Sequence, residues 1–572
     1  MKFLGKKIYF FLILTILLFN TSKIFAKSSE IQYTSENISN YFLGIVSIDK
    51  NYDEQAFDYL KKVKSLKDTH SKFNIEFIRT LVLINKFNKA VNFSKNISSD
   101  EVFLFEADLL VGLDFFIKKD YKNAERYFKK LNRISESNIF FEDFIGNILI
   151  AWSKAAQNNK EDSYRFIGKV PRPYYHLKEA QNIFLQCYFN ENDIEILYKK
   201  MLQQEKYNFS RYHFFLANYL LFNNEVEEAK KIIDHARTDH NSNLLLKQAE
   251  SFLKNEENNK IKNFFDCKKP NDAIAELFYV ISNLYSSEKE YQLSNFYLKI
   301  AMNLNNRFLT NKALLAENFY YQKKNKLSKK TYQSLRSIGN VYSWYAEKSI
   351  AVILEDEKGK EYSVKVLKEK FNLLSNPNYE HYYDLANFYK NRNFYEESIK
   401  YYSLALENLS NDHYLVPKIL DRRGTSYERI GKWQEAEKDL LESLKIIPDQ
   451  PHVLNYLAYS WIEQGTNLDK ALVMLKKATK LKENDGYIID SLGWAYYAKK
   501  NYTQAEYFLQ RAVELMPQDP VINDHYADTL WMLNKNIQAR YFWNYILELD
   551  DTEQKLKDII SKKLIFGVNR KL

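Results

Sequence analysis

Apolar and small side chains recur along this chain with a spacing close to 34 residues. In the clearest copy, a first group of apolar and small residues has the spacing of one helix face, given 3.6 residues per turn. After a polar stretch, a second such group marks the face of a second helix. We expect two antiparallel helices that pack closely through small residues, the second ended by a proline. The positions in this copy are Leu492, Gly493, Tyr496, Ala505, Leu509, Ala512 and Pro517.

A small residue recurs at the start of each second helix and marks the length of the repeat. We call these small residues the ruler. They divide the chain into about fifteen units. A single hairpin cannot bury its apolar face, so the units must stack into a solenoid in which each unit touches mainly its neighbours. The ruler positions are Ala56, Ala90, Ala124, Ala229, Ser294, Ser328, Ser363, Ser398, Ala436, Ala471, Ala505 and Ala539.

Two stretches, 183–201 and 246–265, keep the apolar period but place their small residues poorly. We therefore expect irregular repeats near 183–265, or one repeat fewer. The stretch 552–566 carries Leu556, Ile559, Ile560 and Leu564 on one face, opposite Lys and Asp. This pattern predicts a helix that caps the end of the solenoid.

Composition agrees with a long, folded helical protein. The chain has 572 residues, 45% apolar and 27% charged, which excludes the low-hydrophobicity signature of disorder. Its 13 Gly and 9 Pro are too few for several domains joined by flexible linkers, or for folds rich in hairpins and phosphate loops. Aromatic residues make up 16% of the chain, so a single Tyr or Phe carries little functional information.

The repeat resembles the tetratricopeptide repeat (TPR), a 34-residue helix pair with the pattern Leu-Gly, Tyr, Ala, Phe/Leu, Ala and Pro. The resemblance is strong over 52–130 and strongest over 418–550, and it covers nearly the whole chain after the first 26 residues. It implies an all-α, right-handed TPR-type solenoid. Its parts are the less regular repeats in 27–415, regular repeats in 416–551, and a capping helix with a tail in 552–572.

The last repeats carry a more specific resemblance. The runs 454–461, 485–497 and 520–525 are similar to TPR proteins of the proteobacterial cell envelope. This similarity implies a Gram-negative envelope protein and no particular activity.

The first 26 residues have the form of a cleavable secretory signal. Lys2, Lys6 and Lys7 precede an apolar stretch from Ile8 to Phe19, and Ala26 is a small residue suited to cleavage. Twelve apolar residues are too few to span a bilayer as a helix, although retention as an anchor stays open. We expect an exported, periplasmic protein, peripherally associated with the membrane or free of it, with no transmembrane segment in the mature chain.

The two cysteines and the distribution of charge limit further which class of protein this chain belongs to. An oxidising compartment permits a disulfide between Cys187 and Cys267, but they lie two or three repeats apart, so we expect buried free thiols. The formal net charge of +10 comes from basic residues interspersed with acidic ones, as on solvated helix faces. Nothing here indicates the concentrated basic face of a nucleic-acid-binding protein.

No motif with known catalytic mechanics is present. The chain has no Gly-rich phosphate loop, no Gly-x-Ser-x-Gly, no His-Glu-x-x-His and no Cys-x-x-Cys. Asp524, His525 and Asp528 raise a metal hypothesis, but acids near a helix N-terminus are better explained by the helix dipole. We expect no enzyme activity, no cofactor and no metal.

The TPR resemblance implies a concave groove lined by the second, fifth, ninth and twelfth positions of each first helix. In the last three repeats these positions form an aromatic and acidic or amide strip. Aromatic rings with polar tips suit protein recognition, and the acids favour a partner that offers basic or amide groups. The predicted partner-binding residues are Asn455, Tyr459, Tyr487, Asp490, Trp494, Tyr497, Asp524, Asp528 and Trp531.

Several alternatives remain open at this point. The groove aromatics could instead be packed between neighbouring repeats. Aromatic platforms with Asp and Asn also suit sugars, which favours a polysaccharide-binding or polysaccharide-export accessory protein. A cell-wall-acting enzyme would need acid and base carboxylates in one pocket, and a purely architectural spacer would need no groove residue at all. The leading hypothesis is a non-catalytic scaffold for protein partners in the cell envelope.

Overall fold

A computed structural model describes residues 34–97, 103–132, 143–204 and 208–568. The predicted leader, residues 1–26, lies outside these ranges. The described residues form α-helices and short 3-10 helices, with no strand among them. They divide into two compact units, one reaching Ile353 and the other beginning at Leu354, within α20.

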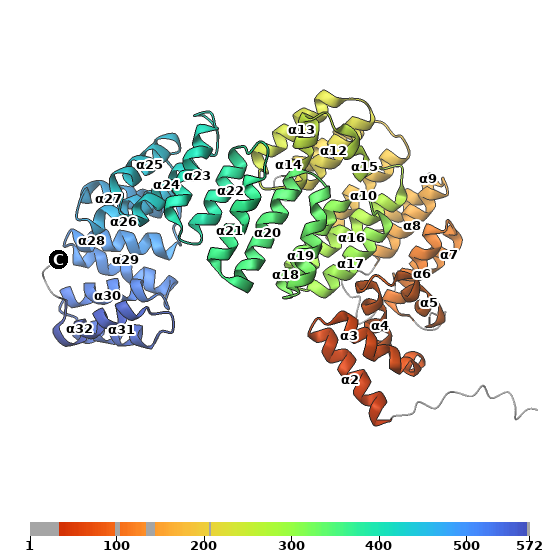
Figure 1. Ribbon diagram of the computed structural model, residues 1–572, viewed down its shortest axis with the longest axis horizontal. Coiled ribbons are helices and arrows are strands. Elements are labelled where there is room, and N and C mark those ends of the chain that lie inside the picture. Colours follow the sequence, from red (N-terminus) through yellow and green to blue (C-terminus); the bar gives the residue numbers. More distant parts are fainter. Residues whose placement is uncertain (1–33, 98–102, 133–142, 205–207, 569–572) are drawn as a thin grey trace, which may run out of the picture. The chain divides into compact units, whose positions relative to one another are not determined.

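Unit 1 contains the helix pairs of the first two thirds of the solenoid (Figure 1). Their α-helices are α2 Ser35–Asp49, α3 Asp53–Leu60, α4 Ser71–Leu83, α5 Phe87–Ile97, α6 Phe105–Ile117, α7 Tyr121–Lys130, α8 Ile145–Ala156, α9 Lys160–Gly168, α10 Tyr175–Tyr188, α11 Ile194–Leu202, α12 Ser210–Phe222, α13 Val226–Asp239, α14 Leu244–Lys254, α15 Asn258–Phe264, α16 Pro270–Ser287, α17 Tyr291–Leu304, α18 Lys312–Tyr321, α19 Asn325–Gln333 and α20 Asn340–Lys358. The 3-10 helices are η2 Lys61–Asp68, η4 Arg172–Tyr174, η5 Leu309–Asn311 and η6 Ser334–Ser337.

Unit 2 holds the regular repeats and the end of the solenoid. Its helices are α21 Lys360–Asn372, α22 Tyr379–Lys390, α23 Tyr395–Glu407, α24 Val416–Arg429, α25 Trp433–Ile446, α26 Pro451–Glu463, α27 Leu468–Leu481, α28 Gly486–Ala498, α29 Tyr502–Leu515, α30 Pro520–Met532, α31 Asn536–Glu548 and α32 Gln554–Phe566. Fifteen pairs from α2/α3 to α30/α31, followed by α32, confirm the predicted helical solenoid. The sequence boundary at 415/416 separates repeats by regularity and falls inside unit 2.

The ruler of small residues lies where the paired helices meet. All twelve predicted positions have no exposed surface, and Ser163 on α9 is an equivalent residue that the sequence pattern missed. The paired helices approach each other so closely that only small residues fit between them. A Cβ added to Gly493 on α28 would lie 2.6 Å from Cγ of Leu509 on α29, so a larger side chain would force the two helices apart.

The turns between paired helices explain how the chain manages with few glycines. Most of them contain one residue with positive φ, at a spacing near 34 residues. Asn tolerates this left-handed conformation better than most residues, and Lys adopts it at a cost. These turn residues are Asn51, Asn85, Lys119, Asn158, Asn190, Asn224, Glu256, Lys289, Lys323, Asn393, Gly431, Gly465, Lys500 and Asn534.

Unit 1 turns back on itself, so its first and later repeats are in contact. Helix α17 packs against α4. Gln292 donates its side-chain N–H to the carbonyl of Ile48 at 2.6 Å, and Lys324 Nζ lies 2.6 Å from Asp53 Oδ2. The ends of this unit are therefore joined by polar contacts between residues more than 200 positions apart.

The same turn overturns the expectation of free thiols. Helix α16 packs against α8 and α10. The segment before α16 therefore returns to the end of α10, and Cys187 and Cys267 form a disulfide with Cα atoms 6.0 Å apart. Counting repeats placed the two cysteines far apart because it assumed a straight stack, and the irregular pairs between α10 and α15 bend the chain back.

Candidate functional site

The first helices of the last three complete repeats carry the predicted partner-binding residues. Asn455 and Tyr459 lie on α26; Tyr487, Asp490, Trp494 and Tyr497 lie on α28; Asp524, Asp528 and Trp531 lie on α30. We call this set the inner strip. Proline at the first position begins α26 and α30, and the Asp485 carboxylate accepts the N–H of Ile488 to cap α28. These start signals place equivalent residues of successive repeats in register.

Three stacked rings form the centre of the inner strip. The ring of Trp494 stacks on that of Tyr497, with centroids 4.3 Å apart, and on that of His525 from α30, at 4.0 Å. Its indole N–H donates to Glu463 Oε1 at 2.8 Å. Trp494 is therefore already engaged within the chain through its ring and its N–H, and these contacts join α26, α28 and α30.

His525 was missed as a strip residue because it lies one position after the groove position Asp524. Its Nδ1 lies 3.0 Å from both carboxylate oxygens of Asp490, one repeat earlier. Burial lowers the pKa of His525, but the Asp490 carboxylate outweighs this and raises it above its ordinary value. A His 35 residues after an Asp was the only sequence clue, since that spacing joins neighbouring first helices.

The acidic pair at the end of the strip is occupied by the chain itself. Lys563 Nζ, from α32, lies 2.7 and 2.8 Å from the two carboxylate oxygens of Asp524 and 2.8 Å from both oxygens of Asp528. The indole N–H of Trp543 also donates to Asp524, at 3.2 Å. The basic group that we expected from a partner is supplied at this position by Lys563.

The ring of Trp531 is covered by the backbone at Gly567, directly after α32. A Cβ added to Gly567 would clash with the Trp531 indole, so the backbone after α32 lies directly against this ring. The guanidinium of Arg540 lies 5.2 Å from the Trp531 ring centroid, and the ring of Trp543 lies at 5.4 Å. Three predicted residues, Asp524, Asp528 and Trp531, thus contact the C-terminal segment.

The other end of the strip presents groups that the chain leaves available. Tyr487 is 54% exposed. The Asn455 Oδ1 atom is buried and has no hydrogen-bond partner among the described residues. Tyr459 is half-buried, and burial raises the pKa of its hydroxyl, so it stays a neutral donor and acceptor. Each of the three residues keeps some exposed surface, although the Asn455 Oδ1 atom itself is buried, and we call them the accessible part of the strip.

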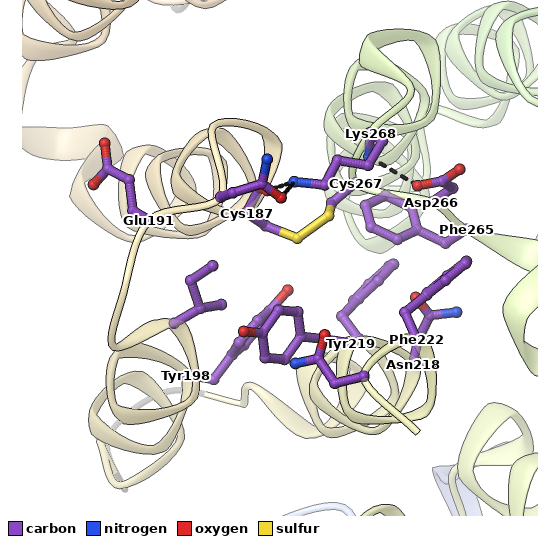
Figure 2. Close-up of a pocket in the computed structure, with 14 residues that line it drawn as sticks. Cys187, Glu191, Tyr198, Asn218, Tyr219, Phe222, Phe265, Asp266, Cys267 and Lys268 are labelled. Atoms are coloured by element: carbon purple, nitrogen blue, oxygen red, sulfur yellow. Dashed lines mark hydrogen bonds between the residues drawn. A yellow bond between two sulfur atoms is a disulfide. The ribbon is translucent and has the colours of Figure 1, made fainter. Parts of the chain in front are cut away.

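A second candidate site is a pocket beside the disulfide in unit 1 (Figure 2). It encloses about 460 Å³ between the ends of α10 and α12 and the segment before α16. Lys268 donates to the Tyr188 carbonyl at 3.1 Å and to Asn190 Oδ1 at 2.5 Å, which closes the end of α10. The lining residues are Cys187, Asn190, Glu191, Ile194, Tyr198, Phe215, Asn218, Tyr219, Phe222, Asn223, Phe265, Asp266, Cys267 and Lys268.

Metal binding gains no support from the geometry. Asp524 and Asp528 converge on the Lys563 ammonium, while His525 faces Asp490. Within the described ranges, no group of three or more His, Cys, Asp or Glu side chains is placed to hold a metal ion. None of the helices described there has the length and apolarity needed to cross a bilayer.

Comparison with known proteins supports the repeat assignment. No family model matches the chain. A TPR repeat-containing protein of Pseudomonas aeruginosa is 31% identical over 103 residues, a match that spans 18% of this chain and 18% of that protein. Together with the fifteen helix pairs, this match confirms the predicted resemblance to TPR proteins.

Two solved structures match longer parts of the chain, each less than half of it. MamA of Desulfovibrio magneticus is 17% identical, with a TM-score of 0.28, over 32% of this chain and 99% of that chain. A tetratricopeptide repeat protein from Parabacteroides merdae is 20% identical, with a TM-score of 0.32, over 41% of this chain and 85% of that chain.

Proposed function

We propose that this protein is an exported, non-catalytic scaffold that binds protein partners in the bacterial cell envelope through the inner strip. A solenoid of short-range contacts offers an extended surface made from successive repeats. The observation that carries the proposal is the accessible part of the strip, where the exposed ring of Tyr487 accompanies the partly exposed side chains of Asn455 and Tyr459. Such polar-tipped aromatic groups are typical of protein interfaces.

The disulfide supports the proposed location. Disulfides persist in oxidising compartments such as the bacterial periplasm and are rare in the cytosol. The bond between Cys187 and Cys267 therefore fits a chain that is exported by the signal-like segment of its first 26 residues.

Affinity capture from envelope extract tests the proposal. The inner variant carries Asn455→Ala, Tyr459→Ala and Tyr487→Ala, which leaves the Trp494 stack and the Lys563 contacts in place. The matched control carries Val473→Ala, Tyr507→Ala and Tyr541→Ala, which lie at equivalent positions on the second helices α27, α29 and α31 and are 67–68% exposed. Circular dichroism checks that both variants fold.

We expect the native chain and the control to retain the same protein partner, and the inner variant to lose it. Equal capture by all three chains would reject the inner strip as the binding surface. Retention of a polysaccharide in place of a protein would favour the polysaccharide-binding alternative. Capture of nothing by the native chain would contradict the scaffold function and favour an architectural spacer.

A further inference from the structure

The groove positions of the final repeat have different contacts from those of the repeat before it. Asp524 and Asp528 are the equivalents, one repeat later, of Asp490 and Trp494. In the repeat of α28 these positions contact other first helices, whereas in the repeat of α30 they contact Lys563 of α32. The end of the inner strip is therefore filled by a segment that follows the last repeat.

The contact at Lys563 has the form of a ligand seated in a site. All four carboxylate oxygens converge on one nitrogen at 2.7 to 2.8 Å. Only 17% of the Lys563 side chain is exposed, and Asp524 and Asp528 are buried. A compact ammonium with three donors fits this arrangement better than the planar fork of a guanidinium.

Helix α32 is held to unit 2 by few other contacts. Ile560 is its only buried residue, with Leu556 and Leu564 packed against the same cluster at partial exposure. Ile565 and Phe566 are 69% and 74% exposed, and no side chain caps the start of the helix. An edge helix with so little buried surface is the kind of element that opens locally without unfolding its neighbours.

We propose that α32 and Gly567 form a displaceable strap, and that Lys563 occupies the place that a lysine of a protein partner takes when it binds. This inference rests on the proposed scaffold function and adds the chemistry of the partner, a helix that presents lysine beside apolar residues as α32 does. The strap covers Asp524, Asp528 and Trp531 in the unbound chain. A partner gains these three residues when the strap moves aside.

A peptide with the sequence of Gln554–Phe566, labelled with fluorescein, tests the proposal on the full chain by fluorescence anisotropy. Ile560→Asp places a charge at the one buried position of α32 and leaves every groove residue unchanged. We expect this variant to bind the peptide about tenfold tighter than the native chain, because the native site is already occupied most of the time. Equal binding by both chains, or binding by neither, would overturn the proposal.

Matched variants show whether the peptide binds through the lysine site formed by Asp524 and Asp528. Adding Asp524→Asn and Asp528→Asn to Ile560→Asp should abolish peptide binding, and a peptide with Lys563→Arg should bind more weakly than the original. Binding that ignores these changes would overturn the assignment of the site to lysine. Circular dichroism of each variant confirms that the solenoid is intact.

Hydrogen exchange of the native chain gives a second measurement that needs no variant. We expect amides of α32 to exchange much faster than those of α28 and α30. Protection of α32 equal to that of α30 would show that the strap does not open, and would overturn the proposal. The peptide and exchange experiments use no envelope partner. If they reject the strap, the affinity-capture result still tests the scaffold function, and if capture finds no partner, these two experiments still test the strap.

Discussion

At the scale of single residues, the least expected feature is the side chain chosen for the turns between helices. The chain has only 13 Gly, the residue that adopts left-handed backbone most readily. The turns contain left-handed positions at nearly every repeat, and Asn or Lys fills most of them, for example Asn534 and Lys500. The short side chain of Asn stabilises this conformation by local hydrogen bonds, whereas the Lys side chain does not.

Lys500→Gly should therefore stabilise the repeat of α28 and α29. Lys500 has a φ of 61°, and replacing it with glycine removes a strain of about 1 kcal/mol, partly offset by the greater freedom of glycine in the unfolded chain. Urea denaturation followed by circular dichroism should show a higher midpoint. Lys499→Gly is the control, because Lys499 has negative φ and pairs with Asp469, so it should give no gain. A lower midpoint for Lys500→Gly would contradict the strain argument.

Protonation of Asp528 should make the end of unit 2 more stable in mild acid. Burial, reinforced by the nearby Asp524 charge, raises the pKa of Asp528 to about 7. Between pH 4 and 7 the folded state thus holds a proton that the unfolded chain has lost, so this group adds stability as the pH falls from 8 towards 5. His525 acts in the same direction, because its raised pKa favours the protonated folded state and that contribution is lost as the pH rises.

Thermal unfolding between pH 5 and 8 measures this dependence, with Asp528→Asn as the comparison. The groups that face Asp528 are Asp524 and His525 on α30, Tyr497 on α28 and Lys563 on α32. We expect the native chain to gain on the order of 1 kcal/mol on acidification, and the variant to gain less. A variant with the same pH dependence as the native chain would show that Asp528 keeps an ordinary pKa.

At the scale of helices, the periodic positions allowed reliable prediction because each one reflects a contact within a repeat. The ruler residues and Gly493 lie between paired helices, where neighbours in sequence are neighbours in space. The strip residues were placed on the correct helices for the same reason. The engagement of Asp524 by Lys563 could not be predicted, because it joins residues 39 positions apart through a helix with no repeat signature.

Gly493→Ala tests how tightly a helix pair is packed. The added Cβ would lie 2.6 Å from Leu509 Cγ and 3.1 Å from the Leu509 backbone nitrogen, so α28 and α29 must move apart. We expect a loss of about 1–3 kcal/mol in the free energy of unfolding of this repeat. Gly168→Ala is the control, because a Cβ there meets nothing within 4 Å and alanine favours the helix. Equal effects of the two changes would contradict close packing as the reason for glycine at 493.

At the scale of the molecule, the sequence predicted a stack of repeats but not the path of that stack. Irregular pairs from α10 to α15 bring α16 back against α8 and α10, and this return creates both the disulfide and the pocket beside it. A repeat count gives distance along the solenoid, and it cannot show where the solenoid meets itself. That is why the pairing of Cys187 with Cys267 was missed.

Loss of the disulfide should destabilise unit 1 and leave unit 2 unaffected. The bond closes a loop of 80 residues, and the entropy of that closure corresponds to about 4 kcal/mol. Hydrogen exchange of the Cys187→Ser, Cys267→Ser chain should show faster exchange in α10 to α16, with no change in α26 to α30. Unchanged exchange in α10 to α16 would show that the bend is held by packing alone.

Photo-crosslinking inside cells shows whether protein partners bind the inner strip of unit 2. A photoreactive phenylalanine analogue replaces either Tyr487 on the inner helix α28 or Tyr507 on the outer helix α29, two tyrosines of one repeat that are 54% and 67% exposed. We expect crosslinks to a protein partner from position 487 and none from position 507. Crosslinks from position 507 alone would place the partner on the second helices and reject the inner strip as the binding surface.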